Sequence, residues 1–142
     1  MKTLTEPLHL GTLRGPLNLA IGVFDGLHLG HQAVIRAALA SGKQNGGEVV
    51  VITFCPHPVT VLAPGNAPRL LTSTQHKARL LADLLQVQNL LVINFDRSFS
   101  EKSGESFIRQ LWDSSEFASI SVGKDFQFGK GRSGNISLLE KL

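Results

Sequence analysis

Two histidines stand three residues apart in the stretch GVFDGLHLGH, residues 22–31, directly after an apolar run. The pattern predicts that a strand ends here and that His28 and His31 lie in the first turn of a helix, on one side of it. Gly30 between them leaves the helix backbone open to a ligand, although glycine costs about 1 kcal/mol relative to alanine inside a helix. The free N–H groups and positive dipole end of a helix attract an anion. Because the imidazoles add donors for phosphate oxygens, the stretch predicts a site for a phosphorylated ligand.

Two other interpretations of the histidine pair stay open on the residues alone. Histidines in the first turn of a helix can be capping or surface residues, and a histidine pair can bind zinc. The order of strand, Gly-x-Phe-Asp-Gly turn and His-x-Gly-His favours the phosphate site over a surface role. Zinc is disfavoured because no third ligand stands at a suitable local spacing and the chain has no H-E-x-x-H motif.

The elements that must position this turn follow from the hydrophobic pattern. Short apolar runs alternate with helical patterns, which predicts an α/β fold with a parallel sheet covered by helices on both faces. The predicted strands span residues 18–23, 48–54, 90–95 and 119–123. The predicted helices span residues 28–43, 73–86 and 103–115. Two long loops, 55–72 and 124–134, are expected at the carboxyl ends of strands, where α/β sheets bind ligands.

The helical patterns also predict where the first helix ends, where the third helix begins and which side chains the third helix buries. The first helix is expected to close on Gly42, before a turn at Gly46 and Gly47. The third helix is expected to begin at Ser103. Its apolar positions predict four buried side chains: Phe107, Ile108, Leu111 and Trp112.

Composition limits the class of protein. The chain has 142 residues, 42% of them hydrophobic, and a net charge of +3, which is typical of one globular domain. Its basic residues are scattered and it has no Tyr and one Trp, so we expect no nucleic-acid partner. We also expect no membrane span and no secretory signal. The chain has a single cysteine, Cys55, so no intrachain disulfide can form and we expect a cytoplasmic location. We expect the Cys55 thiol to be buried, with no catalytic role.

Four stretches resemble a known family. The histidine stretch resembles the H-x-G-H signature of the nucleotidyltransferase superfamily, which includes cytidylyltransferases, pantetheine-phosphate adenylyltransferase and class I aminoacyl-tRNA synthetases. Two further stretches, TFCPHPVTVLAP (53–64) and VGKDFQFGKGRSGN (122–135), look like bacterial FAD synthetase, the N-terminal module of bifunctional riboflavin kinase/FAD synthetase. RLLTSTQHKARLLADL (69–84) resembles the LTS…K…L helix of that family. The resemblance implies a Rossmann-like sheet of nucleotidyltransferase type.

The resemblance also implies roles for particular side chains. His28 and His31 would stabilise the ATP phosphates and the transition state. The residues that would shape the nucleotide pocket are Gly22, Phe24, Asp25 and Gly30. The residues that would line the flavin side are Pro56, Pro58 and Phe128. Asp125 corresponds to the Asp or Asn that the family places near the phosphates and magnesium.

The sequence departs from the family pattern at three positions. Val23 stands where Asn is common, Cys55 where an acidic residue is common, and Asn135 where Asp is frequent. The stretch GKGRSG, residues 129–134, matches G-x-G-x-x-G literally, but a dinucleotide fingerprint needs its first glycine at a strand end and an acidic residue about 20 positions later. We interpret it as a loop whose Arg132 reaches a phosphate.

The reaction that the resemblance implies is transfer of the adenylyl group of ATP to FMN, giving FAD and pyrophosphate. The FMN phosphate oxygen would attack the α-phosphorus in line, with Mg²⁺ bridging the phosphates and no covalent protein intermediate. The expected partners are the small molecules ATP, FMN and FAD. Two alternatives stay open: a nucleotidyltransferase for another phosphorylated acceptor, and a non-catalytic module that binds flavin or nucleotide.

We expect residues 1–142 to form a single domain of this type. The family's domain continues to a second phosphate-binding motif of the S-S-T-x-I-R type and usually to a C-terminal riboflavin kinase domain, and both are absent from this sequence. The domain is therefore expected to be shortened, which is the feature that favours the non-catalytic alternative.

Overall fold

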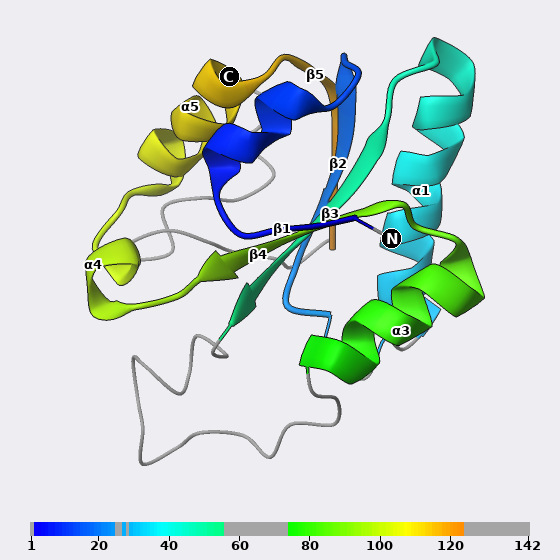
Figure 1. The fold of residues 1–142 in the computed structure, drawn as a ribbon, viewed down its shortest axis with the longest axis horizontal. Coiled ribbons are helices and arrows are strands. Elements are labelled where there is room, and N and C mark those ends of the chain that lie inside the picture. The colour runs from blue at the N-terminus through cyan, green and yellow to red at the C-terminus, as the bar shows by residue number, and fades with distance from the viewer. Residues whose placement is uncertain (1, 25–26, 28, 56–73, 124–142) are drawn as a thin grey trace.

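A parallel sheet forms the centre of the computed structural model, which describes residues 2–24, 27, 29–55 and 74–123 (Figure 1). Within these ranges the sheet has five strands in the order β1-β4-β3-β2-β5, and every neighbouring pair is parallel. The strands are β1 (Lys2–Leu4), β2 (Leu17–Ile21), β3 (Val49–Cys55), β4 (Asn89–Asn94) and β5 (Phe117–Val122). The helices are η1 (Pro7–Thr12), α1 (Leu29–Asn45), α3 (Thr74–Leu85), α4 (Arg97–Ser100) and α5 (Gly104–Ser114).

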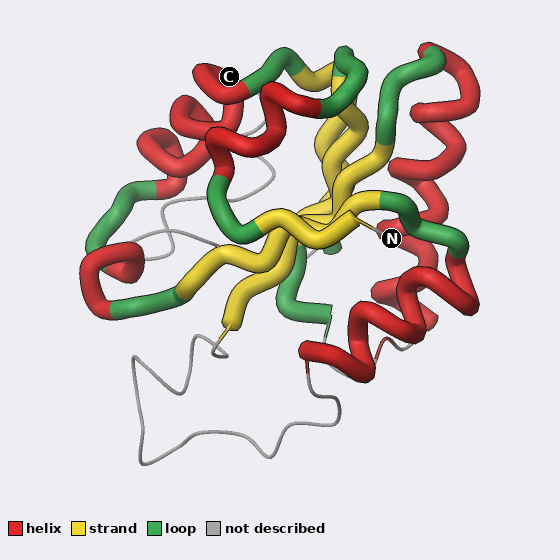
Figure 2. Tube along the Cα trace, in the orientation of Figure 1, coloured by secondary structure: helices red, strands yellow, loops and turns green. Residues whose placement is uncertain are grey.

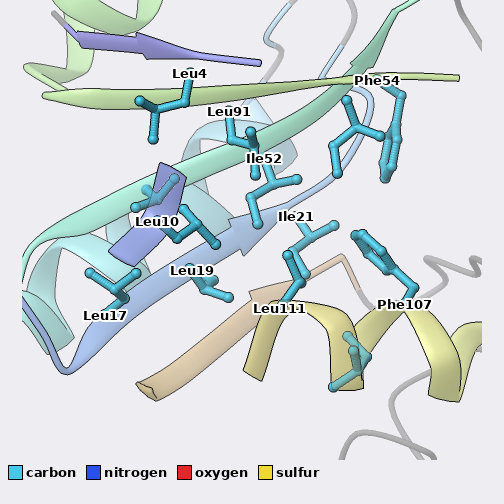
Figure 3. Close-up of a cluster of buried hydrophobic side chains, with 13 residues drawn as sticks. Leu4, Leu10, Leu17, Leu19, Ile21, Ile52, Phe54, Leu91, Phe107 and Leu111 are labelled. Carbon is cyan, nitrogen blue, oxygen red and sulfur yellow. The ribbon is translucent and has the colours of Figure 1, made fainter. Parts of the chain in front are cut away.

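Helices cover both faces of the sheet, which confirms the predicted α/β class (Figures 1 and 2). Successive side chains of a strand point to opposite faces. Ala20, Val51 and Leu90 therefore join a core with side chains of α1 and α3. The neighbouring positions in the same strands, such as Ile21 and Ile52, face the opposite core, where η1 and α5 pack (Figure 3). Because the central strands are covered on both faces, they contain apolar residues almost continuously.

The four predicted strands and three predicted helices are all present, with small differences in their bounds. The first helix does not close on Gly42 as predicted, but continues to Asn45 and ends at Gly46, where φ is 76°. An added Cβ at Gly42 would lie 2.7 Å from Cγ2 of Val49, so this glycine allows α1 to approach β3. The elements β1, η1 and α4 are short and were not predicted from the sequence.

Two burial predictions are wrong. Trp112 is 50% exposed, because it lies at the margin of the apolar face of α5; its ring is perpendicular to that of Phe117, with centroids 4.9 Å apart. The other three side chains predicted to be buried in α5 are buried. Cys55 is exposed, because it is the last residue of β3, where the strand leaves the covered part of the sheet. α5 begins at Gly104, one residue after the predicted start at Ser103, and Ser103 is its N-cap, since its side chain accepts from the Ser106 N–H at 3.1 Å.

The order in which the chain adds strands to the sheet reverses at β2, and we call this point the change of direction. From β2 the chain moves outward through α1 to β3 and through α3 to β4. It then returns through α5, on the other face, to β5 on the opposite side of β2. In open α/β sheets such a point leaves a crevice outside the carboxyl ends of the strands, where ligands bind. The connection from β2 to α1, which contains the histidine stretch, begins at this point.

A polar cluster fixes the far end of α1. Asn18 of β2 is fully buried, and its side-chain amide exchanges two hydrogen bonds with that of Asn45, at 3.0 and 2.8 Å. The Ser119 hydroxyl of β5 also donates to Asn18 Oδ1, at 2.9 Å. Because a buried amide must be paired, these bonds fix the last turn of α1 relative to two strands.

Replacement of Asn45 tests this attachment. We expect Asn45→Ala to lower the free energy of unfolding by about 1–3 kcal/mol, because the buried amide of Asn18 loses its reciprocal partner. Urea denaturation measures the change. The matched control is Gln44→Ala, an exposed position of the same helix turn, which should change the free energy by less than about 0.5 kcal/mol. Equal effects of the two substitutions would contradict the attachment.

Candidate active site

The connection from β2 to α1 contains two bulky residues in a conformation that favours glycine. Phe24 has a φ of 55° and Leu27 a φ of 47°. Left-handed backbone of this kind is uncommon for bulky side chains, and persists where the surrounding structure holds it in place. The Gly22 N–H continues the sheet by donating to Ile52 O at 3.1 Å, and the Leu27 N–H closes the turn on Phe24 O at 3.3 Å.

The ring of Phe24 packs directly over Gly22. Phe24 is 2% exposed and belongs to the core beneath α1. A Cβ added to Gly22 would lie 2.9 Å from both Cε1 and Cζ of that ring, which is closer than real Cβ atoms approach a neighbour. Gly22 therefore makes room for the ring, and the turn can fold back within a few residues of the strand.

His31 lies in the first turn of α1 and contacts the same ring. The two rings are edge to face, with centroids 5.5 Å apart and an interplanar angle of 84°. His31 is half-buried, with Nδ1 buried, whereas Gly30 beside it is exposed. The structure thus brings together Gly22, Phe24, Gly30 and His31, four of the residues predicted for the nucleotide site.

A buried lysine, to which no role was assigned from the sequence, holds the peptide that begins the turn. Lys77 of α3 is 5% exposed, and its Nζ donates to Val23 O at 2.6 Å. The hydroxyl of Thr53, from β3, donates to the same oxygen at 2.8 Å. One signal was visible in the sequence: Lys77 stands four residues before the buried Leu81, on the apolar side of its helix. Thr53 was a second, since it interrupts an otherwise apolar strand.

The remaining predicted site residues lie outside the described residues. They are Asp25, His28, Pro56, Pro58, Asp125, Phe128 and Arg132. Their roles stay predictions. In the described ranges no three His, Cys, Asp or Glu side chains gather as metal ligands. Within the same part of the chain, no helix combines the length and apolar character that a bilayer-spanning segment requires.

A pocket of about 780 Å³ lies at the opposite edge of the sheet. It is lined by residues at the amino ends of β3 and β4 and along α1 from its middle to its carboxyl end, among them Arg36 and Lys43. Cations near the end of a helix complement the negative pole of its dipole. Lys43, in the last turn of α1, is accounted for in this way without a ligand, and none of the candidate site residues that the structure describes lines the pocket.

Comparison with known proteins identifies similar sequences over most of the chain. A family model described as FAD synthetase matches residues 13–142. The chain is 38% identical over 125 residues to the bifunctional riboflavin kinase/FMN adenylyltransferase of Buchnera aphidicola subsp. Schizaphis graminum, covering 87% of this chain and 40% of that protein. It is 37% identical over 124 residues to the protein of the same description from Escherichia coli K12, covering 87% and 39%.

Two further similarities concern a shorter relative and a solved structure. The FAD synthetase of Listeria monocytogenes is 36% identical over 126 residues, which cover 87% of this chain and 50% of that protein. A crystal structure described as a macrolide-efflux protein from Streptococcus pneumoniae superposes with a TM-score of 0.78 and 21% identity, over 99% of this chain and 47% of that one. At this identity the likeness shows the fold alone. The chain spans from about two fifths to half the length of these relatives.

The contact between Gly22 and the Phe24 ring can be tested by a double-mutant cycle. We expect Gly22→Ala to lower the free energy of unfolding by about 1–3 kcal/mol, because the new Cβ forces the buried ring to move. In a Phe24→Leu background the same substitution should cost less, because Cε1 and Cζ are absent. Denaturant unfolding of the four proteins measures both values. The same cost in both backgrounds would refute the contact.

Proposed function

Because the chain belongs to the FAD synthetase family, we propose that it transfers the adenylyl group of ATP to FMN and so forms FAD and pyrophosphate. The family match over residues 13–142 is the observation on which this proposal depends most. The geometry supports it, since the first turn of α1 begins at the change of strand direction, with Gly30 exposed and His31 beside it. The chain spans about two fifths of the length of these first relatives, and the proposal therefore concerns only the adenylyl transfer.

Binding of ATP would use the first turn of α1. The first N–H groups of a helix have no partner within the helix, and with the helix dipole they attract phosphate. The exposed Gly30 adds no side chain that would keep a phosphate from this backbone. His31 would meet the phosphate through Nε2, because its Nδ1 is buried. We propose that His28 adds a second imidazole at the same place.

The reaction itself is a displacement at phosphorus. An oxygen of the FMN phosphate forms a bond to the α-phosphorus of ATP as the bond from that phosphorus to the pyrophosphate oxygen breaks. No protein group needs to be modified, so catalysis rests on holding both phosphates in line and on placing positive charge where negative charge develops. His28, His31 and Arg132 would supply that charge, and Pro56, Pro58 and Phe128 would hold the flavin.

A divalent metal would accompany ATP, and we propose Mg²⁺. Most ligands would be phosphate oxygens and water, as is usual for this ion. Asp125 would be the protein ligand, and the nucleotide-binding residues would include Asp25. When bound, the ion would neutralise part of the phosphate charge. The expected cytoplasmic location stays a prediction.

An assay with FMN, radiolabelled ATP and Mg²⁺ tests the proposal directly. Formation of labelled FAD is the expected result. Flavin binding without turnover would instead support the non-catalytic alternative, and turnover only with another phosphorylated acceptor would support a different nucleotidyltransferase. Each of these two results would overturn adenylyl transfer to FMN.

The two histidines should be required for rate. We expect His28→Ala and His31→Ala each to lower kcat by about 10²-fold or more, because removal of one donor to a developing charge typically costs this much. The matched control is His9→Ala, an exposed histidine of η1, which should leave kcat unchanged. Thermal unfolding of each variant separates loss of rate from loss of fold. Turnover like that of the unsubstituted protein would refute the assigned role.

Removal of the metal gives an independent check. We expect excess EDTA to abolish FAD formation and added Mg²⁺ to restore it, because the phosphate charges would otherwise repel the attacking FMN phosphate. Far-UV circular dichroism should not change, because the ion would be held mainly by phosphate oxygens and water and not by the fold. Full activity in EDTA would exclude a metal requirement.

A further inference from the structure

Two hydrogen-bond donors converge on one carbonyl oxygen at the end of β2. Lys77 Nζ lies 2.6 Å from Val23 O and 3.3 Å from Thr53 Oγ1. Thr53, itself 1% exposed, donates to Val23 O at 2.8 Å. The lysine comes from α3 and the threonine from β3, so two separate elements hold the peptide that joins Val23 to Phe24.

The fold alone does not account for a lysine at this place. An ammonium loses its hydration when it is buried, and an apolar side chain of similar length is often as stable or more stable there. Lys77 is 5% exposed and lies on the side of α3 that contains the fully buried Leu81. Thr53 by itself would give Val23 O a partner. The Lys77 ammonium is therefore better explained by its hold on the Val23 carbonyl than by a contribution to the stability of the fold.

A short series of contacts leads from this carbonyl to the histidine. Phe24 follows Val23 directly, and its φ of 55° depends on how the preceding peptide is held. The Phe24 ring lies over Gly22 and stands edge to face with the His31 imidazole. A rotation of the Val23–Phe24 peptide would move the ring and remove the support of the imidazole.

We propose that Lys77 is a positioning residue, which holds the Val23 carbonyl and thereby sets, through Phe24, the orientation of the His31 imidazole. Its effect on catalysis rests on the proposed adenylyl transfer, whereas its effect on the imidazole does not. Lys77 acts with Thr53, and neither needs to touch a substrate.

The test compares Lys77→Met with Arg79→Met, which removes a positive charge from an exposed position of the same helix. The main readout is the Cε1–H resonance of His31 in NMR spectra, assigned with a His31→Asn variant. This resonance depends on the position of the Phe24 ring. We expect Lys77→Met to shift it and Arg79→Met to leave it in place, with both variants still unfolding cooperatively in a thermal melt.

Kinetics provide the second readout. A catalytic group displaced by about 1 Å can lose about 10²-fold in rate, so we expect kcat for FAD formation to fall by about that factor in Lys77→Met. KM for FMN should stay the same, because the role proposed for the buried lysine is to hold a backbone carbonyl and not to bind the flavin. Arg79→Met should leave both constants unchanged.

The outcomes separate this proposal from the proposed function. A His31 resonance that does not move in Lys77→Met overturns the positioning role, whatever the activity. If the protein forms no FAD at all, the function is refuted but the NMR comparison still decides the role of the lysine. If Lys77→Met does not fold, Thr53→Val removes the other donor with little change of shape. We expect a smaller shift of the resonance in that variant, and no shift overturns the proposal.

Discussion

The packing of the Phe24 ring over Gly22 determines where the candidate site lies relative to the sheet. The ring can occupy this place only because residue 22 has no Cβ, since an added one would lie 2.9 Å from two ring atoms. With the ring there, Phe24 takes a left-handed backbone and the chain turns from β2 into α1 within a few residues. The ring then supports the imidazole of His31. The absence of a Cβ at Gly22 therefore allows the packing that links the end of β2 to the first turn of α1.

The helix that follows is held at both ends by different kinds of contact. At its carboxyl end, the buried amide of Asn18 pairs with the side-chain amide of Asn45. At its amino end, the support is the Phe24 ring and the peptide that Lys77 holds. A helix attached in this way presents its first N–H groups in a fixed direction, which is what electrostatic stabilisation of a phosphate requires. The polar contacts and the packing thus serve the same purpose.

The hydrophobic pattern along the sequence predicted most of the strands and helices, because apolar residues recur at the positions that face the core. The same patterns do not show where a covering element ends, and for this reason Trp112 and Cys55 were wrongly expected to be buried. Gly42 looked like a helix end because glycine is common there, but it serves close approach to Val49. The role of Lys77 could not be predicted, because its partner is a backbone carbonyl 54 residues away in the sequence. Every residue has a backbone carbonyl, so residue type does not indicate which carbonyl a lysine will contact.

The motifs that predicted the function are far apart in the sequence but follow strands that are neighbours in the sheet. β2 lies between β3 and β5, and all three run in the same direction. The register pairs Ile21 with Ile52 on one side and with Val122 on the other, so the three carboxyl ends meet at one edge. β3 and β5 therefore end on either side of the turn that leads to His31. A parallel sheet with its change of direction at β2 is the reason that three separate motifs can serve one site.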